Sequence, residues 1–259
     1  MATRLWDRAS QLPVPVDGRR RPEVPVLPPG LPSVAELFTF MRDAELRFAT
    51  LRMRIEETVA VGSGAQTTVI DTMLRHPADA RVTTTDPARG IAGNYEVWIS
   101  DGETVRTYSA THRLGTERPV RRSVVGLEDR DLPGMSTVYR AVTPLPMETL
   151  PDTFVHPAGF CQNVLATGRC WIAGSADVGG REGITVECDH PRTTEIAGDR
   201  PDHHFQLIVD RETGVILRLV ETIGGSTTRD ATVTSLLPDA PLPPAAFEFT
   251  FPTGTTLIY

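Results

Sequence analysis

The chain has 259 residues, of which 40% are hydrophobic and 23% are charged, values typical of a globular protein with one substantial core. Its net charge of −7 argues against binding to a nucleic-acid backbone, which depends on clustered cations. All 26 basic residues are arginines, so chemistry that needs a lysine, such as Schiff-base formation, is excluded.

Residues 1–32 are predicted to form an extended arm. The segment from residue 10 to 32 contains seven prolines and the basic triplet Arg19-Arg20-Arg21. Proline restricts φ and lacks an amide proton, so this segment favours a polyproline-like conformation over a helix or central strand. The triplet could contact an acidic partner, although a solvated run of charge is the simpler interpretation.

Targeting signals are not apparent in the sequence. A secretory signal needs an apolar core of about 7–15 residues, and a membrane-spanning helix needs about 20. Neither run is present. If Met1 is the natural start, we therefore expect a cytoplasmic protein.

A helix is predicted to begin at Ser33, because Ser33 and Glu36 have the spacing of a capping box. Apolar residues then follow at helical spacing and predict a stripe that covers other structure: Leu37, Phe40, Met41, Ala44 and Phe48. We expect one long helix that extends to about residue 50.

Most of the remaining chain alternates between apolar and polar residues, the pattern of β-strands. The stretch WISDGETVRTY, residues 98–108, places an Asp-Gly pair between two alternating runs, which is the strongest short signal for a β-hairpin. A two-residue turn at that pair would place Ser100 opposite Glu103 and Trp98 opposite Val105.

The second half repeats this design. Strands are predicted in CWIAGSADVGG, GITVECD, HHFQLIVD, VILRLVETIGG and TTRDATVTSLL, after a short helix that begins at Pro157. Near the end, Phe247, Phe249 and Phe251 alternate, which predicts a last strand that joins the sheet with all three rings on one side.

The order of these elements predicts an α+β fold. Short loops between successive strands indicate antiparallel pairing, because parallel strands need long crossovers. We expect one large, curved antiparallel sheet, with the N-terminal helix and short helical elements packed on one face. Residues 33–259 should form a single domain.

Several stretches in this order carry a resemblance to a known family: the N-terminal helix, then YEVWISDGETVRTY, FQLIVDRETGVILRLVE and the closing SLLPDAPLPPAAFEFTFPTG. Over residues 34–259 the chain resembles the LolA/RseB-like superfamily of lipoprotein carriers and envelope-stress sensors. The resemblance implies an incomplete β-barrel with helices over a concave, apolar cavity that binds acyl chains or lipidated proteins without catalysis. A lipoprotein carrier that works outside the cytoplasm requires a signal peptide, and the sequence shows none. From the resemblance we therefore expect for this chain only the fold and the capacity to bind an apolar ligand, not lipoprotein sorting.

Catalytic and metal-binding signatures are incomplete. The G-x-S-x-G pattern of a serine hydrolase is missing, and the six histidines lack the i, i+4 spacing of a metalloprotease. Cys161, Cys170, Cys188 and His190 are the best metal candidates, but cysteine separations of nine and eighteen are wider than those of structural zinc. A Cys161–Cys170 disulfide is an alternative in an oxidising compartment, and buried thiols are the simplest interpretation.

Two further groups are weaker candidates. Glu56 or Glu57 could pair with Asp71 on a neighbouring strand, although charges at the rim of a sheet explain them better. His203 and His204 are neighbours in a predicted strand and should point to opposite faces. We therefore predict no catalytic residue, no metal and no cofactor.

The leading hypothesis is a non-enzymatic binding protein that holds an apolar, acyl or lipid-like ligand, or a partner segment, in the curved sheet. The alternatives are a protein-interaction or regulatory module with a solid interior and a docking N-terminal arm, and an enzyme of unrecognised type. Neither a nucleic-acid partner nor a membrane span is expected. Residues that could line a ligand cavity, each with ordinary core packing as its alternative, are Phe40, Met41, Trp98, Trp171 and Phe205.

Overall fold

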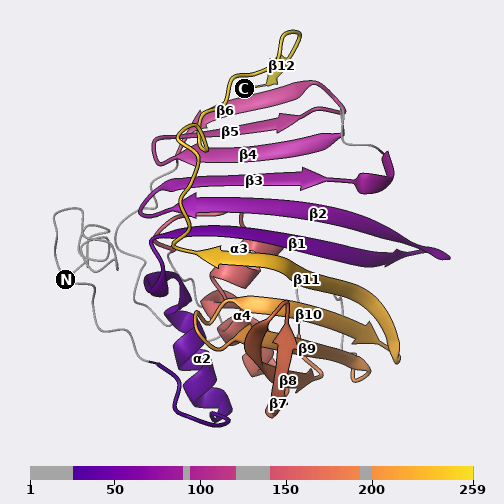
Figure 1. Ribbon diagram of the computed structural model, residues 1–259. Coiled ribbons are helices and arrows are strands. Elements are labelled where there is room, and N and C mark those ends of the chain that lie inside the picture. Colours follow the sequence, from indigo (N-terminus) through magenta and orange to yellow (C-terminus); the bar gives the residue numbers. More distant parts are fainter. Residues whose placement is uncertain (1–25, 90–93, 121–140, 193–199, 259) are drawn as a thin grey trace, which may run out of the picture.

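A single 12-stranded sheet dominates the computed structural model, which describes residues 26–89, 94–120, 141–192 and 200–258. The strands lie in the order β12-β6-β5-β4-β3-β2-β1-β11-β10-β9-β8-β7 (Figure 1). Their bounds are β1 (Thr50–Val61), β2 (Gly64–Arg75), β3 (Asp79–Thr85), β4 (Tyr95–Asp101), β5 (Thr104–Ser109), β6 (Leu114–Pro119), β7 (Arg169–Val178), β8 (Arg181–Asp189), β9 (His203–Asp210), β10 (Ile216–Ile223), β11 (Ser226–Pro238) and β12 (Thr256–Ile258).

The pairing confirms the predicted fold class with one exception. Each pair of neighbouring strands is antiparallel except β12, which runs parallel to β6. The sheet does not close on itself, since β12 and β7 remain at its two ends. It is an open, curved sheet, as expected of an incomplete barrel.

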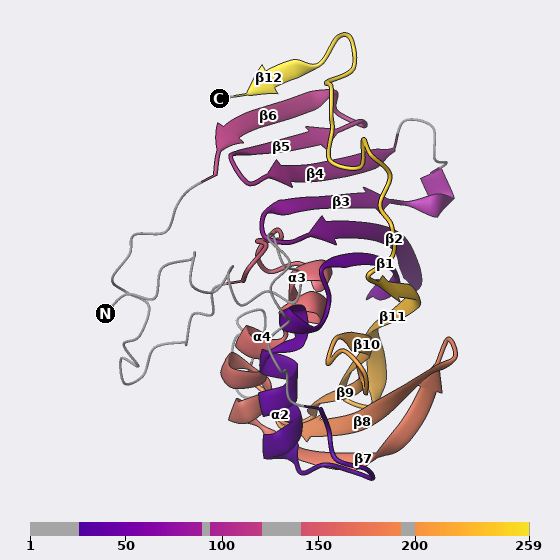
Figure 2. The ribbon, with the colours of Figure 1, turned by 60° about the vertical axis from the view of Figure 1, so that its left-hand side comes forward.

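Short helices cover the concave face. They are α2 (Val34–Arg42), α3 (Leu150–Val155) and α4 (Ala158–Asn163), with 3₁₀ turns η1 (Ala44–Arg47), η2 (Pro87–Arg89) and η3 (Leu165–Thr167). Within the described ranges, none of the helices has the length and hydropathy needed to cross a membrane. Figure 2 shows α2, α3 and α4 gathered over the half of the sheet that holds β1 and β11 to β7.

The N-terminal helix begins as predicted but is shorter. The Ser33 hydroxyl accepts the Glu36 amide at 3.2 Å, and the Glu36 carboxylate accepts the Ser33 amide at 2.8 Å, which completes the capping box. The α-helix ends at Arg42, and η1 leads the chain into β1 from Thr50. The predicted apolar stripe is nevertheless buried along its whole length. Its members are Leu37, Phe40, Met41, Ala44 and Phe48.

The main core lies between these helices and the concave face. Strand residues that point to this side include Leu51, Ile55, Leu207, Leu219 and Val233, all of them buried. The positions between them, such as Arg52 and Arg54, point to the other face and are exposed. The period-two pattern in the sequence therefore corresponds to the two faces of the sheet.

The predicted hairpin is present, but its register is shifted. Ser100 lies opposite Val105 rather than Glu103, and Trp98 lies opposite Thr107 rather than Val105. The turn is centred one residue later than expected, because Gly102, with φ of 83°, and Glu103 occupy its two central positions. The Asp101 side chain closes the turn by accepting the amides of Glu103 and Thr104 at 3.0 and 2.7 Å.

The C-terminal segment differs from the prediction. Residues 247–251 form no strand, and the short β12 joins the sheet instead. The three phenylalanines are half-buried while Glu248 and Thr250 are exposed, so the predicted sidedness holds without a strand. Phe249 and Phe251 pack against Tyr108 with ring centroids 5.9 and 6.4 Å away. In Figure 2 this segment crosses the sheet on the side opposite to the helices.

Candidate binding site

The five residues predicted to line a ligand cavity lie in three separate places. Phe40, Met41 and Phe205 are buried in the core beneath the helices. Trp98 is half-buried on the helix-bearing face of β4, and Trp171 is 38% exposed on β7. The structure therefore does not bring the five together into one site.

The three core residues are closely packed. The Arg47 guanidinium lies 3.7 Å from the centre of the Phe40 ring, and a side chain at Gly214 would approach that ring to 3.2 Å. The Cys161 thiol donates to the Met41 sulfur at 3.7 Å. The Phe205 ring meets the Phe160 ring of α4 edge-on at 5.6 Å. Contact between these residues and a ligand would require α2 and α4 to move away from the sheet.

Trp98 borders a cavity of about 320 Å³ on β4, β5 and β6. Trp98 lies opposite Thr107, and Thr107 lies opposite Thr116, so the three side chains form a row on the helix-bearing face. The two threonine hydroxyls hydrogen-bond each other at 2.7 Å. Leu114, Ser109 and the exposed Glu96, which lies opposite Ser109, complete this side of the lining. Within the described residues, the buried Ser109 hydroxyl has no hydrogen-bond partner.

The sequence identified Trp98 but missed the residues beside it. The assumed hairpin register placed Val105, not Thr107, across from the indole. Thr107 and Thr116 carry no catalytic pattern, so only the correct register could have revealed the row. A turn centred on Gly102 and Glu103 was the signal that would have given it.

Trp171 lies on the opposite face, beside His204, with ring centroids 6.2 Å apart. His204 is held from both sides, with Nδ1 2.7 Å from Asp189 and Nε2 2.6 Å from Glu187. Partial burial opposes the charge, but these hydrogen bonds raise the pKa of His204. His203 points the other way into the core, as predicted for neighbours in a strand, and its Nε2 lies 2.8 Å from Glu221.

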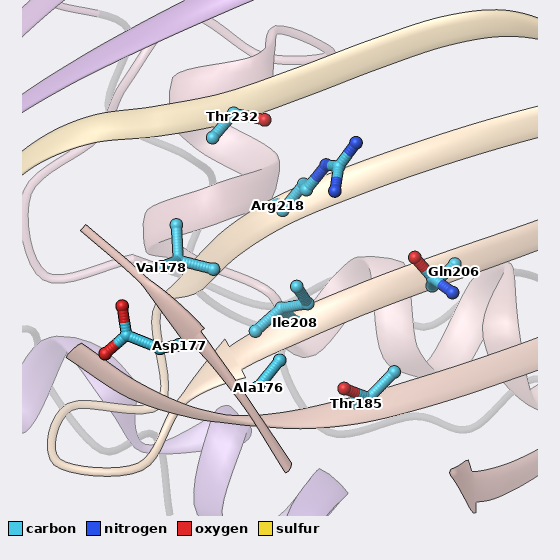
Figure 3. Close-up of a pocket in the computed structure, with 8 residues that line it drawn as sticks. All are labelled: Ala176, Asp177, Val178, Thr185, Gln206, Ile208, Arg218 and Thr232. Carbon is cyan, nitrogen blue, oxygen red and sulfur yellow. The ribbon is translucent and has the colours of Figure 1, made fainter. Parts of the chain in front are cut away.

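A second cavity, of about 440 Å³, lies on the face away from the helices (Figure 3). Ala176 and Val178, from the far end of β7, stand over Ile208 of β9. An irregularity in the β7–β8 register between Ile172 and Gly174 accompanies this bend of the edge strand. The cavity is therefore a recess under a curled sheet edge.

Three polar side chains that line this recess, those of Arg218, Gln206 and Asp177, have partners within the chain, and Asp177 accepts the Gly180 amide at 3.0 Å. Arg218 forms a bidentate ion pair with Asp230, with distances of 3.0 and 2.6 Å. Hydrogen bonding to Asp230 raises the pKa of Arg218, and hydrogen bonding to Arg218 lowers the pKa of Asp230. Gln206 donates to Glu187 at 2.7 Å. The side chains that could bind a charged ligand are thus already paired.

The residues considered from the sequence as metal candidates do not assemble into a site. Among the described residues, no three His, Cys, Asp or Glu side chains are placed to hold a metal ion. The three cysteines are free thiols, and Cys170 lies directly across the sheet from Cys188. The neighbour of Cys170 on the adjacent strand is therefore Cys188, and not Cys161, the partner considered from the sequence.

The possible carboxylate pair also separates. Asp71 pairs with Arg54 at 3.3 Å, whereas Glu57 pairs with Arg229 at 3.1 Å. Glu57 and its neighbour Glu56 point to opposite faces of β1, as successive strand residues do. Asp71 and Glu57 each form an ion pair with an arginine on a neighbouring strand instead.

A buried polar cluster beside α3 was not foreseen. His76 Nε2 lies 2.9 Å from the Glu45 carbonyl, which can only accept, so Nε2 carries the proton. His76 Nδ1 then accepts the Thr143 hydroxyl at 2.7 Å. The Glu45 carboxylate accepts the Val142 amide at 2.7 Å. Burial, with a smaller contribution from nearby His156, lowers the pKa of His76 to about 4.

No protein-family model matches the sequence, and no curated protein matches it. MucB is a solved structure with 15% identity and a TM-score of 0.48; the match covers 83% of this chain and 62% of MucB, so the chain spans less than two thirds of it. An uncharacterized conserved protein from Thermus thermophilus has 9% identity and a TM-score of 0.48, and the match covers 86% of this chain and 98% of that protein. A LolA superfamily protein from Nitrosomonas europaea has 9% identity and a TM-score of 0.35, and the match covers 84% of this chain and 98% of that protein.

Proposed function

We propose that this chain is a non-enzymatic binding protein that holds an apolar, acyl-like ligand in the cavity beside Trp98. One observation carries the proposal. The half-buried indole borders about 320 Å³ of space on the helix-bearing side of β4, β5 and β6, a region over which no helix of the described residues lies (Figure 2).

The lining favours an apolar chain over an anionic ligand, because its charged side chain is the Glu96 carboxylate. Trp98 and Leu114 offer apolar surface, and the hydrogen bond between Thr107 and Thr116 leaves mainly their methyl groups for a ligand. The volume is at the lower end of the range of about 300–1,000 Å³ for small-ligand pockets. This size fits a single chain, and the unpartnered Ser109 hydroxyl could bind one polar group on it.

Catalysis has little support from the described side chains. Within the described ranges, His76 hydrogen-bonds a hydroxyl that could act as a nucleophile, that of Thr143, but Thr143 is completely buried. The second ring nitrogen of His76 is held by a backbone carbonyl. A substrate could not reach this pair without opening the core, so we assign the cluster a structural role.

The test is ligand binding by protein from which bound lipid has been extracted, titrated with a fluorescent fatty acid. Trp98→Ala should weaken binding about tenfold or more, because a loss of about 1.4 kcal/mol corresponds to a factor of ten. Trp171→Ala is the matched control, since that indole lies on the opposite face of the sheet. Equal effects of the two substitutions, or none for Trp98→Ala, would contradict the proposal.

The second candidate is an interaction module that docks through its N-terminal arm. Two observations favour it: the closely packed interior beneath α2, and the attachment of the arm's end to the sheet. Arg211 donates to the carbonyls of Pro28 and Gly30 at 2.6 and 2.8 Å. The arm's Arg19 to Arg21 lie outside the described residues. Comparing partner recovery by the full chain with that by a chain starting at Ser33 separates the two candidates. The expected cytoplasmic location stays a prediction.

A further inference from the structure

Two thiols face each other across the edge of the sheet. Cys170 of β7 and Cys188 of β8 are directly opposed residues of an antiparallel pair. Such residues have Cα atoms about 4.5–5.5 Å apart, within the range of about 4.4–6.8 Å that a disulfide spans. Both cysteines are reduced in the structure. The backbone thus already holds them at bonding distance.

Both thiols also share one hydrogen-bond acceptor. The carbonyl oxygen of Leu165 lies 3.1 Å from the Cys170 sulfur and 3.5 Å from the Cys188 sulfur. Leu165 begins η3, the turn that joins α4 to β7. At the end of this turn, a side chain at Gly168 would come within 2.8 Å of the Cys188 sulfur. The two thiols therefore help to hold the η3 backbone against the sheet.

The two cysteines differ in reactivity. Cys188 is buried, whereas Cys170 is half-buried at the edge strand. The Cys188 thiol has one proton, which it can donate either to the Leu165 carbonyl or to the Cys170 sulfur, and the hydrogen bond to Cys170 lowers the pKa of Cys170. Burial raises the pKa of the third thiol, Cys161, which is enclosed under α2. Because the thiolate is the nucleophile, Cys170 should react first with a small oxidant.

We propose that Cys170 and Cys188 form a peroxide-sensitive dithiol site that closes to a reversible cross-strand disulfide. The Cys170 thiolate attacks hydrogen peroxide, breaks the O–O bond and becomes a sulfenic acid, while the departing hydroxide takes up a proton to leave as water. The Cys188 sulfur then attacks the sulfenic sulfur, and its proton leaves with the hydroxyl as a second water. Two thiols are oxidised and one peroxide is reduced. The inference does not depend on the proposed ligand.

Oxidation should loosen the turn that follows α4. Disulfide formation removes both S–H groups that donate to the Leu165 carbonyl and leaves it the Gly168 amide, at 3.1 Å, as a donor. The turn thus loses the hydrogen bonds that join it to β7 and β8, which weakens its attachment to the sheet. The effect reaches the helical layer, since α4 contacts α2 through the Cys161 thiol and the Met41 sulfur at 3.7 Å. The disulfide state should thus hold α4 and η3 less firmly than the dithiol state.

Peptide mapping tests the bond directly, because trypsin separates the three cysteines. The chain has no lysine, and cleavage at arginine places Cys161 in residues 141–169, Cys170 in 170–181 and Cys188 in 182–192. Folded full-length protein is treated with hydrogen peroxide, blocked with N-ethylmaleimide and digested without reductant. We expect a linked 170–181/182–192 species that dithiothreitol abolishes. A 141–169/170–181 species, links between molecules, or unlinked oxidised cysteines would overturn the proposal.

Variants and exchange measurements complete the test. Cys161→Ala should leave the linked species intact, and Cys188→Ser should abolish it and leave a sulfenic acid on Cys170 that dimedone traps. If either variant does not fold, the wild-type map still decides about the bond. Amide hydrogen exchange in residues 161–168 should be faster in the oxidised protein and return to the original rate after reduction. Unchanged exchange in the disulfide-bonded protein would overturn the loosening of η3.

Discussion

At the residue scale, the most informative group is His76, which lies in the turn between β2 and β3. Its ring stacks on Phe48 with centroids 5.6 Å apart, and both nitrogens have partners. These contacts tie β1 and β2 to the segment around Thr143, far along the chain. Hydrogen-bond partners so distant in sequence cannot be read from a local pattern. The folded protein therefore favours the neutral form of the His76 ring.

The depressed pKa of His76 predicts acid destabilisation. The folded value of about 4 lies below the unfolded value of about 6.5, so protonation favours the unfolded chain. The stability of the neutral form is fully present above about pH 6.5 and is lost as the pH falls towards 4. The full effect is about 3 kcal/mol. Unfolding in denaturant at several pH values should show that His76→Gln flattens this decline; an unchanged decline would contradict the assignment.

At the element scale, α2 illustrates what a local pattern can settle. The capping box and the apolar stripe are both present as predicted. The helix is nevertheless shorter than expected, because η1 and the start of β1 take up the positions after Arg42. Local spacing determines which face of the helix a side chain occupies, whereas the end of the helix depends on where the sheet begins.

The close packing of α2 predicts a full core penalty for Phe40→Ala. Phe40 is only 4% exposed and lies under Arg47, so truncation should leave a cavity and cost about 3–5 kcal/mol of unfolding free energy. The exposed Thr39→Ala is the control and should change it by less than about 0.5 kcal/mol. Urea unfolding of both variants measures this. A loss near 1 kcal/mol for Phe40→Ala would reveal existing space beneath the helix.

At the scale of the whole molecule, the sheet is covered on both faces by different parts of the chain. The helices cover one half of the concave face, and the C-terminal segment crosses the other face (Figure 2). There Phe251 packs closely over Gly115, where a side chain would come within 2.5 Å of its ring. Phe249 and Phe251 also bury Tyr108.

Removing residues 247–259 should therefore prevent stable folding. The truncation uncovers Tyr108, Val97 and Ile99, which are buried on this face, and so exposes an apolar patch. We expect insoluble protein, or soluble protein without a cooperative thermal transition. A chain that ends at Thr255 lacks only β12 and should remain folded, since Leu257 and Ile258 are 40% and 49% exposed. Cooperative melting of the chain that lacks residues 247–259 would contradict the stabilising role of the C-terminal segment.

The sequence by itself determined the features that depend on spacing: an α+β fold with a large antiparallel sheet, the N-cap at Ser33, the buried stripe of α2 and the opposite orientations of His203 and His204. These follow because each side chain's direction depends on its position within a helix or strand. Only the tertiary structure decided the hairpin register, which set Thr107 beside Trp98, and the pairing of Cys170 with Cys188. It also showed that the closing phenylalanines cover the sheet without forming a strand. Those features depend on contacts between distant segments, and alternation alone gives them no unique solution.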